Sequence, residues 1–134
     1  TIAGVRSEKP GKYESSGDIA LNSQSAKPLI GPNTTIGVVV TNAQLTTTQL
    51  KKIANMAHDG LARAVRPVHT QFDGDTMFAM SMPDSAQSGE SVAESLLNTV
   101  GIAAAKVMEL AIIDAVKSAE SLGGVVASCD WAKK

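Results

Sequence analysis

The sequence predicts an α/β fold in which helices pack against a sheet. Residues 35–41 and 76–82 are apolar runs with strand character, and each precedes a segment with helical periodicity, so strands and helices alternate along the chain. Apolar residues make up 43% of the 134 residues but aromatic residues only 3%, so the core must consist mainly of aliphatic side chains at helix–sheet contacts. This length suits one domain with a sizeable core, and we expect no second one.

Residues 1–33 differ in composition from the rest of the chain. Residues 1–5 have the character of a short strand, and the segment after them is rich in Ser, Gly, Lys and Asn, without sustained periodicity. We therefore expect a mostly irregular connector that faces solvent. Its serine content is equally compatible with disorder.

The first strand and the first helix have clear local signals. Residues 35–41 form a continuous β-branched run, which is typical of a strand buried on both faces. Thr46 and Gln49 have the spacing of a capping box, and Pro67 disfavours helix beyond Val65. Apolar residues at intervals of three and four predict one amphipathic helix between these limits, with Leu50, Ile53, Ala57, Leu61 and Ala64 on one face.

The second half of the chain repeats the strand–helix order. Residues 76–82 alternate between two faces and are ended by Pro83, so we expect a strand with Met77, Ala79 and Ser81 on one side. Residues 91–121 predict a long helix that is apolar nearly all round and therefore central to a layer, with a kink at Gly101. Residues 122–134 resemble a tail that has Trp131 as its large anchor.

Charge and composition argue against several classes of partner. The 12 Lys and Arg balance the 13 Asp and Glu, and no basic cluster is interleaved with aromatic residues, so we expect no nucleic acid. Charged residues interrupt the apolar runs before they reach the roughly 18 residues that a membrane span requires, so we expect no membrane. A lone Cys129 and the absence of a secretory signal favour the cytoplasm, although a mature secreted chain would also lack its signal.

Metal and cofactor sites are not indicated either. His58 and His69 have no partner at metal-ligand spacing, and the pair Asp73 and Asp75 does not fit the calcium-loop pattern. We expect neither a metal nor a cofactor, and we expect Cys129 to be inert.

The junction before the first strand can carry chemistry. Pro32 constrains the chain on one side of the Asn33–Thr34 bond, and the β-branched run constrains the other. There the Thr34 hydroxyl could attack the Asn33 carbonyl and make Thr34 a new chain start, with hydroxyl nucleophile and α-amino base in one residue. Two plainer interpretations stay open, since Thr-Thr is also ordinary strand chemistry and Asn33-Thr34-Thr35 also fits an N-glycosylation acceptor.

Four segments together resemble a known family. They occur in the order Asn33-Thr34-Thr35-Ile36, Val40-Thr41-Asn42-Ala43, Pro67-Val68-His69-Thr70 and Asp73-Gly74-Asp75-Thr76-Met77-Phe78-Ala79. In this they resemble the DmpA-type aminopeptidases, which are self-processing hydrolases, and look most similar to the nylon-oligomer (6-aminohexanoate-oligomer) hydrolase branch. The resemblance implies an αββα four-layer sandwich, in which residues 34–134 are the short β segment and residues 1–33 the end of a longer α segment. It also implies tetramers of αβ units.

The same resemblance assigns roles at the site. It implies autocleavage between Asn33 and Thr34, Thr34 as catalytic nucleophile, and Asp73 and Asp75 as residues that orient or polarise it. Without the resemblance, Asp-Gly indicates only a tight turn. His69 either lines the pocket or fixes the loop from Pro67 by a hydrogen bond, and His58 is expected to be a surface or packing residue.

Three functions are compatible with these observations. The preferred one is an amidohydrolase that cuts short peptides or amide oligomers through an acyl-enzyme, with its oxyanion donors in the α segment outside this sequence. The resemblance also allows an acyltransferase, because ornithine acetyltransferases share the fold and a threonine nucleophile. The third is a non-catalytic α/β module for oligomer contacts, in which Thr34 lies in an uncut strand.

Overall fold

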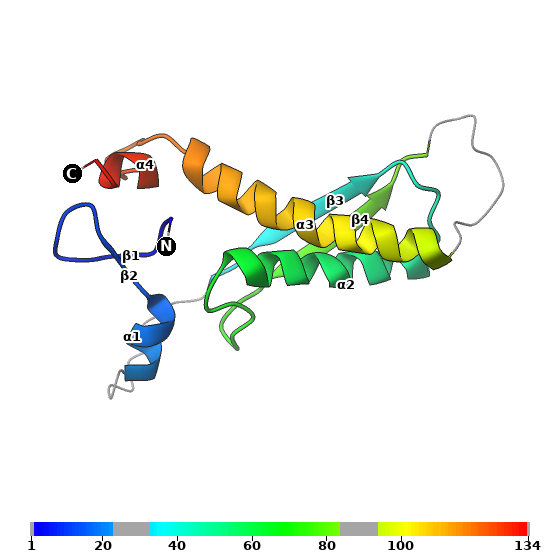
Figure 1. Cartoon of the computed structure of the whole chain (residues 1–134), viewed down its shortest axis with the longest axis horizontal. Helices are drawn as coiled ribbons and strands as arrows, with labels where there is room; N and C mark the ends of the chain where they lie inside the picture. The colour runs from blue at the N-terminus through cyan, green and yellow to red at the C-terminus, as the bar shows by residue number, and fades with distance from the viewer. Residues whose placement is uncertain (1, 23–32, 84–93, 134) are drawn as a thin grey trace. The chain divides into compact units, whose positions relative to one another are not determined.

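The computed structural model describes residues 2–22, 33–83 and 94–133, and it confirms a mixed α/β chain (Figure 1). The chain forms two compact units. Residues 32–109 make up one, and residues 1–31 together with 110–134 make up the other.

The unit of residues 32–109 is built on a parallel pair of strands. Strand β3 (Ile36–Thr41) pairs with β4 (Thr76–Ser81), and helix α2 (Thr47–Ala64) connects them. Parallel neighbours need such a crossover, and the alternating strand and helix signals predicted it. The pairing register is constant, with Val38 opposite Phe78 and Val40 opposite Met80.

Local signals set the ends of α2. The Thr46 hydroxyl accepts a hydrogen bond from the backbone amide of Gln49, and the Gln49 side-chain oxygen accepts one from the backbone amide of Thr46. The predicted capping box is therefore confirmed. The helix ends at Ala64 and is capped by the extended residue Val65, two positions before Pro67, as predicted.

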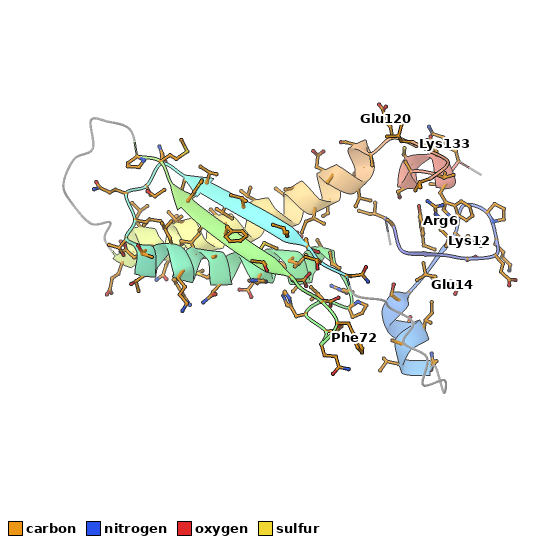
Figure 2. The ribbon with its side chains drawn as sticks, turned by 180° about the vertical axis from the view of Figure 1, so that it is seen from behind. Arg6, Lys12, Glu14, Phe72, Glu120 and Lys133 are labelled. Carbon is orange, nitrogen blue, oxygen red and sulfur yellow. The ribbon has the colours of Figure 1, made fainter. Side chains whose placement is uncertain are left out.

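The core of this unit lies between α2, one face of the strands and α3 (Glu94–Ser118). Figure 1 shows both helices on one side of the strand pair. Figure 2 views the molecule from the opposite side, where the strands lie in front of the helices. Small residues permit the helix contact, because a Cβ at Gly60 would collide with the Ala105 carbonyl oxygen. Gly101, where we expected a kink, instead makes room for the Met56 side chain. The buried apolar residues of this unit are Ile53, Ala57, Leu61, Met77, Ala104, Ala105 and Met108.

The prediction that β3 is buried on both faces is wrong for this chain. Ile36, Val38 and Val40 are 69, 55 and 56% exposed, because α2 and α3 cover only the opposite face. Phe78 and Met80 of β4 lie on the same exposed face by register. As predicted, Met77, Ala79 and Ser81 share the other face, which is the one packed on the helices. The strand pair therefore has a second, uncovered apolar face.

The prediction that the last long helix is central to a layer is also wrong for this chain. Its buried residues, Gly101, Ala104, Ala105 and Met108, form one narrow stripe, whereas Ile102 and Val107 are exposed. By length and composition alone α3 could cross a membrane, a test that the core helix of a soluble protein also passes.

The other unit joins the two ends of the sequence. It contains the antiparallel strands β1 (Val5–Arg6) and β2 (Tyr13–Glu14), and the short helices α1 (Ser16–Asn22) and α4 (Ser128–Trp131). The expected irregular connector is thus partly ordered. Its first strand begins at Val5, the last residue of the predicted range 1–5, and ends at Arg6. Residues 23–32 lie outside the described part.

Side chains hold the first residues of this unit to the last ones. The Arg6 guanidinium lies 5.1 Å from the ring centroid of Trp131 and donates to the carbonyl oxygen of Val126. The Trp131 indole donates to the Lys12 carbonyl at 3.1 Å, which confirms Trp131 as an anchor. Figure 2 shows Arg6 and Lys12 on the segment beside α4.

Candidate functional site

The two predicted motifs meet at one edge of the parallel strand pair. Because β3 and β4 run in the same direction, the residues before them lie side by side. Asn33 forms a parallel bridge with Asp73, and the offset of 40 positions then continues from Ile36 opposite Thr76 to Thr41 opposite Ser81. The segments Asn33-Thr34-Thr35 and Asp73-Gly74-Asp75 are therefore neighbours in space.

Backbone hydrogen bonds connect these two segments. The Asn33 amide donates to the Phe72 carbonyl at 3.3 Å, the Gly74 amide donates to the Asn33 carbonyl at 2.9 Å, and the Thr76 amide donates to the Thr35 carbonyl at 2.9 Å. The carbonyl of the predicted scissile bond is therefore itself hydrogen-bonded, by Gly74.

Thr34 is exposed at this edge, and its hydroxyl lies over Gly74. A Cβ placed on Gly74 would be 2.8 Å from Thr34 Oγ1, closer than such atoms normally approach. Gly74 thus leaves open the space in which the Thr34 hydroxyl sits.

Asp75 is nearly buried and uses both carboxylate oxygens. Its side chain is 7% exposed, Oδ1 accepts from the Thr35 amide at 3.0 Å, and Oδ2 accepts from the His69 amide at 3.3 Å. His69 Nδ1 lies 3.1 Å from the same Oδ2. Burial by itself raises the pKa of Asp75, but the hydrogen bonds from Thr35 and His69 outweigh it and hold the pKa below its ordinary value. Asp75 is therefore an ionised acceptor that binds the amide of Thr35, the residue that follows Thr34.

Asp73 has a different environment. Its Oδ2 accepts from the Thr70 amide at 2.7 Å, and its own amide donates to the Thr70 carbonyl at 3.0 Å. These bonds close a tight turn over residues 70–73, and Asp73 itself pairs with Asn33, so the Asp73-Gly74 dipeptide follows the turn and does not form it. The structure brings Asn33, Thr34, Asp73 and Asp75 to one edge, and the orienting role of the two aspartates stays a prediction.

His69 contributes more than the sequence indicated. Its φ of 55° places it in the left-handed region, and both its amide and its ring nitrogen contact Asp75. The interpretation of His69 as a residue that fixes this loop by a hydrogen bond is confirmed. His58 of α2 is half-buried, with its ring 4.9 Å from the His69 ring in an edge-on arrangement, which agrees with a packing role.

Sequence reasoning missed Thr35 as the partner of Asp75. The equal spacing of Asn33-Thr34-Thr35 and Asp73-Gly74-Asp75 contained that signal once the two strands are paired in register. Across residues 2–22, 33–83 and 94–133, no group of three acidic, cysteine or histidine side chains could hold a metal ion. Cys129 lies in α4, in the other unit.

Several known proteins are similar to this chain over much of its length. A 6-aminohexanoate-oligomer endohydrolase of a Kocuria species is 32% identical over 90 residues, which are 63% of this chain and 25% of that protein. An uncharacterised aminopeptidase of Mycobacterium leprae is 42% identical over 118 residues, 83% of this chain and 33% of that protein. One of Mycobacterium tuberculosis is 41% identical over 100 residues, 69% of this chain and 29% of that protein. The chain spans about a third or less of the length of these relatives.

A protein-family model also matches residues 1–128, and its description is peptidase family S58. The predicted resemblance to DmpA-type aminopeptidases and nylon-oligomer hydrolases is confirmed by this match and by the names of the relatives. Since the match includes nearly every residue of the sequence, this chain belongs to peptidase family S58.

Proposed function

We propose that the protein carrying this chain is a self-processing amidohydrolase with Thr34 as its nucleophile. The observation that supports this most is the position of the Thr34 hydroxyl over Gly74. The two aspartates that flank Gly74 are held nearby, Asp73 by the Thr70 amide and Asp75 by the Thr35 amide. A peptidase family and relatives named as an aminopeptidase and an oligomer endohydrolase support amide hydrolysis as the reaction.

Processing begins with attack of Thr34 Oγ on the Asn33 carbonyl carbon. The acyl group moves from the Thr34 nitrogen to its oxygen, and water then opens the ester, leaving a carboxylate on Asn33 and a free amine on Thr34. The Gly74 amide, 2.9 Å from the Asn33 oxygen, is placed to stabilise the negative charge that develops there. Asn33 and Thr34 are thus the two sides of the cut.

After processing, Thr34 supplies both nucleophile and base. Its α-amine, with an ordinary pKa near 8, accepts the proton of the hydroxyl as the oxygen attacks a substrate amide. The amine fragment leaves, and water hydrolyses the acyl-enzyme ester. Asp73 and Asp75 orient Thr34 in this scheme. Short peptides and linear amide oligomers are the proposed substrates, because relatives are named for both kinds of activity.

We place this chain in the C-terminal part of an αββα four-layer sandwich. Parallel strands normally have both faces covered, and here α2 and α3 cover one, leaving the apolar face of Ile36, Val38 and Phe78 exposed. The remaining length of the relatives supports a second layer on that face. The oxyanion donors for substrate, the tetramer of αβ units and a cytoplasmic location belong to the same proposal.

An intact mass of the denatured full-length protein tests the proposal. We expect two fragments, one of which begins at Thr34. Thr34→Ala should abolish both the cut and amide hydrolysis, Thr34→Ser should retain part of each, and Thr48→Ala on the exposed first turn of α2 should behave as wild type.

Two outcomes would redirect the assignment. A Thr34→Ala protein that hydrolyses amides at the wild-type rate excludes Thr34 as the nucleophile. A wild-type protein that stays uncut and inactive favours the non-catalytic module, for which the exposed apolar face would be an oligomer contact. Transfer of the acyl group to an added amine in preference to water would identify the acyltransferase.

A further inference from the structure

We propose that His69 is a positioning residue for the Thr34 reaction, and that it acts by holding the Asp75 carboxylate against the backbone amide of Thr35. This inference rests on the proposed function of Thr34. It assigns a role to a histidine that the reaction scheme above does not use.

The Asp75 carboxylate has a contact at each of its two oxygens. The side chain could rotate away from Thr35 unless the second oxygen were held. His69 contacts that oxygen twice: its backbone amide donates a hydrogen bond at 3.3 Å, and its ring Nδ1 lies at an ion-pair distance of 3.1 Å. With Oδ2 held in this way, Oδ1 stays on the Thr35 amide at 3.0 Å. Hydrogen bonds to an ionised, nearly buried carboxylate are among the stronger ones in proteins.

The backbone of His69 has a left-handed conformation. A φ of 55° is tolerated by glycine, asparagine, aspartate and histidine better than by other residues. In this conformation the amide and the ring nitrogen of one residue contact the same carboxylate oxygen. The position therefore favours a residue that combines a left-handed backbone with a donor two bonds beyond its Cβ.

A backbone amide links Asp75 to the proposed nucleophile. The Thr35 amide belongs to the peptide plane that follows Thr34, so a hydrogen bond to that amide restrains ψ of Thr34. The side chain of Thr34 leaves the same Cα, and its hydroxyl must keep its place over Gly74. A displacement of about 1 Å at a reacting group is enough to slow a reaction on the order of a hundredfold.

The His69 ring is in contact with the ring of His58. The His58 ring stands edge-on at 4.9 Å from the His69 ring, and it projects from α2, which is anchored in the core by Ile53, Ala57 and Leu61. His69 itself is 39% exposed, so water can compete for Asp75 if the ring is removed. The contacts run from the rigid helix through the two rings to Asp75 and Thr35.

Three substitutions at one position separate the contact of a polar nitrogen with Asp75 from the rest of the ring. In His69→Asn, the amide nitrogen occupies the place of Nδ1 and can donate to Asp75, while His69→Asp has the same shape without the donor. His69→Gly keeps the backbone conformation and removes the side chain. We expect His69→Asn to process at Asn33–Thr34 within about threefold of wild type, and the Asp and Gly variants to be slower on the order of ten- to hundredfold.

The control is Thr48→Ala, which shortens an exposed side chain in the first turn of α2 and leaves the contacts between His69 and Asp75 in place. It should process within about threefold of wild type. If His69→Asn were as slow as His69→Gly, the ring rather than the donor would matter and the inference would be overturned. Equal rates for all three variants at position 69 would overturn it as well.

Hydrogen exchange at the Thr35 amide tests the same contact without relying on catalysis. In the full-length protein, His69→Gly and His69→Asp should accelerate exchange at Thr35 on the order of tenfold, and His69→Asn should retain protection. If wild type is never cut, the function of Thr34 fails, while this measurement still decides whether His69 holds Asp75 on Thr35. Unchanged protection in all three variants contradicts the inference even if processing is normal.

Discussion

Gly74 and Asn33 are joined by a hydrogen bond at the bond we expect to be cut. The Gly74 amide lies 2.9 Å from the Asn33 carbonyl oxygen, and the Cα of the same glycine faces the Thr34 hydroxyl. One residue thus contacts both the carbonyl that is attacked and the group that attacks it, and the absence of its side chain makes this possible.

Replacing Gly74 by alanine should slow processing at Asn33–Thr34. The added Cβ would lie 2.8 Å from Thr34 Oγ1, so the hydroxyl must move, and a loss on the order of tenfold or more is expected. The time course of fragment formation measures it. Gly17→Ala is the matched control, since its Cβ would be an ordinary 3.8 Å from the nearest atom, in Ser15.

Replacing Gly60 by alanine should destabilise the fold without touching the site. A Cβ there collides with the Ala105 backbone, which cannot move as a flexible side chain can, so α2 and α3 must separate. Overpacking of this kind costs about 1–3 kcal/mol of unfolding free energy. Chemical denaturation measures the change. Gly17→Ala in α1 should show no such loss, and equal stabilities for both variants would contradict the helix contact described here.

Acid should remove a contribution of Asp75 to stability. Because its folded pKa lies below its ordinary value of about 4, the ionised form stabilises the fold. That stabilisation is complete above the unfolded pKa and is lost as pH falls through the lower, folded pKa. We therefore expect the stability difference between wild type and Asp75→Asn to be largest near neutral pH and to shrink below pH about 4. Urea unfolding over this range checks it, and a constant difference would contradict the ionised state of Asp75.

Phe78 tests whether the exposed strand face is covered in the full-length protein. Phe78→Glu would place a charge in a buried layer and should lower the melting temperature by several degrees or more, whereas Phe78→Leu keeps an apolar side chain and should cost less. If Phe78→Glu has the same melting temperature as Phe78→Leu and wild type, that face is in contact with water and the sandwich is not supported.

The elements of residues 32–109 were predictable from the sequence because their signals are local. The bonds between Thr46 and Gln49 begin α2, and Pro67 excludes helix beyond Val65. The alternation correctly predicted that Met77, Ala79 and Ser81 share one face of β4.

Burial was less predictable than the elements themselves. The run from Ile36 to Val40 is apolar on both faces, but what covers each face depends on chain that is distant in sequence. The same reason explains why α3 has an exposed side despite its composition. In residues 2–22, contacts such as Arg6 with Trp131 order a segment whose sequence has no periodicity.

The sequence by itself determined the chemistry available at the site, the family resemblance and the residues before each strand. Only the tertiary structure decided that Asn33 pairs with Asp73, that Gly74 contacts both Asn33 and Thr34, and that Asp75 is shared between Thr35 and His69. The physical reason is that residue types and short spacings can be read from neighbouring positions in the sequence, whereas these contacts join segments that are distant in it. The register between segments 40 positions apart arises only when the two strands pair.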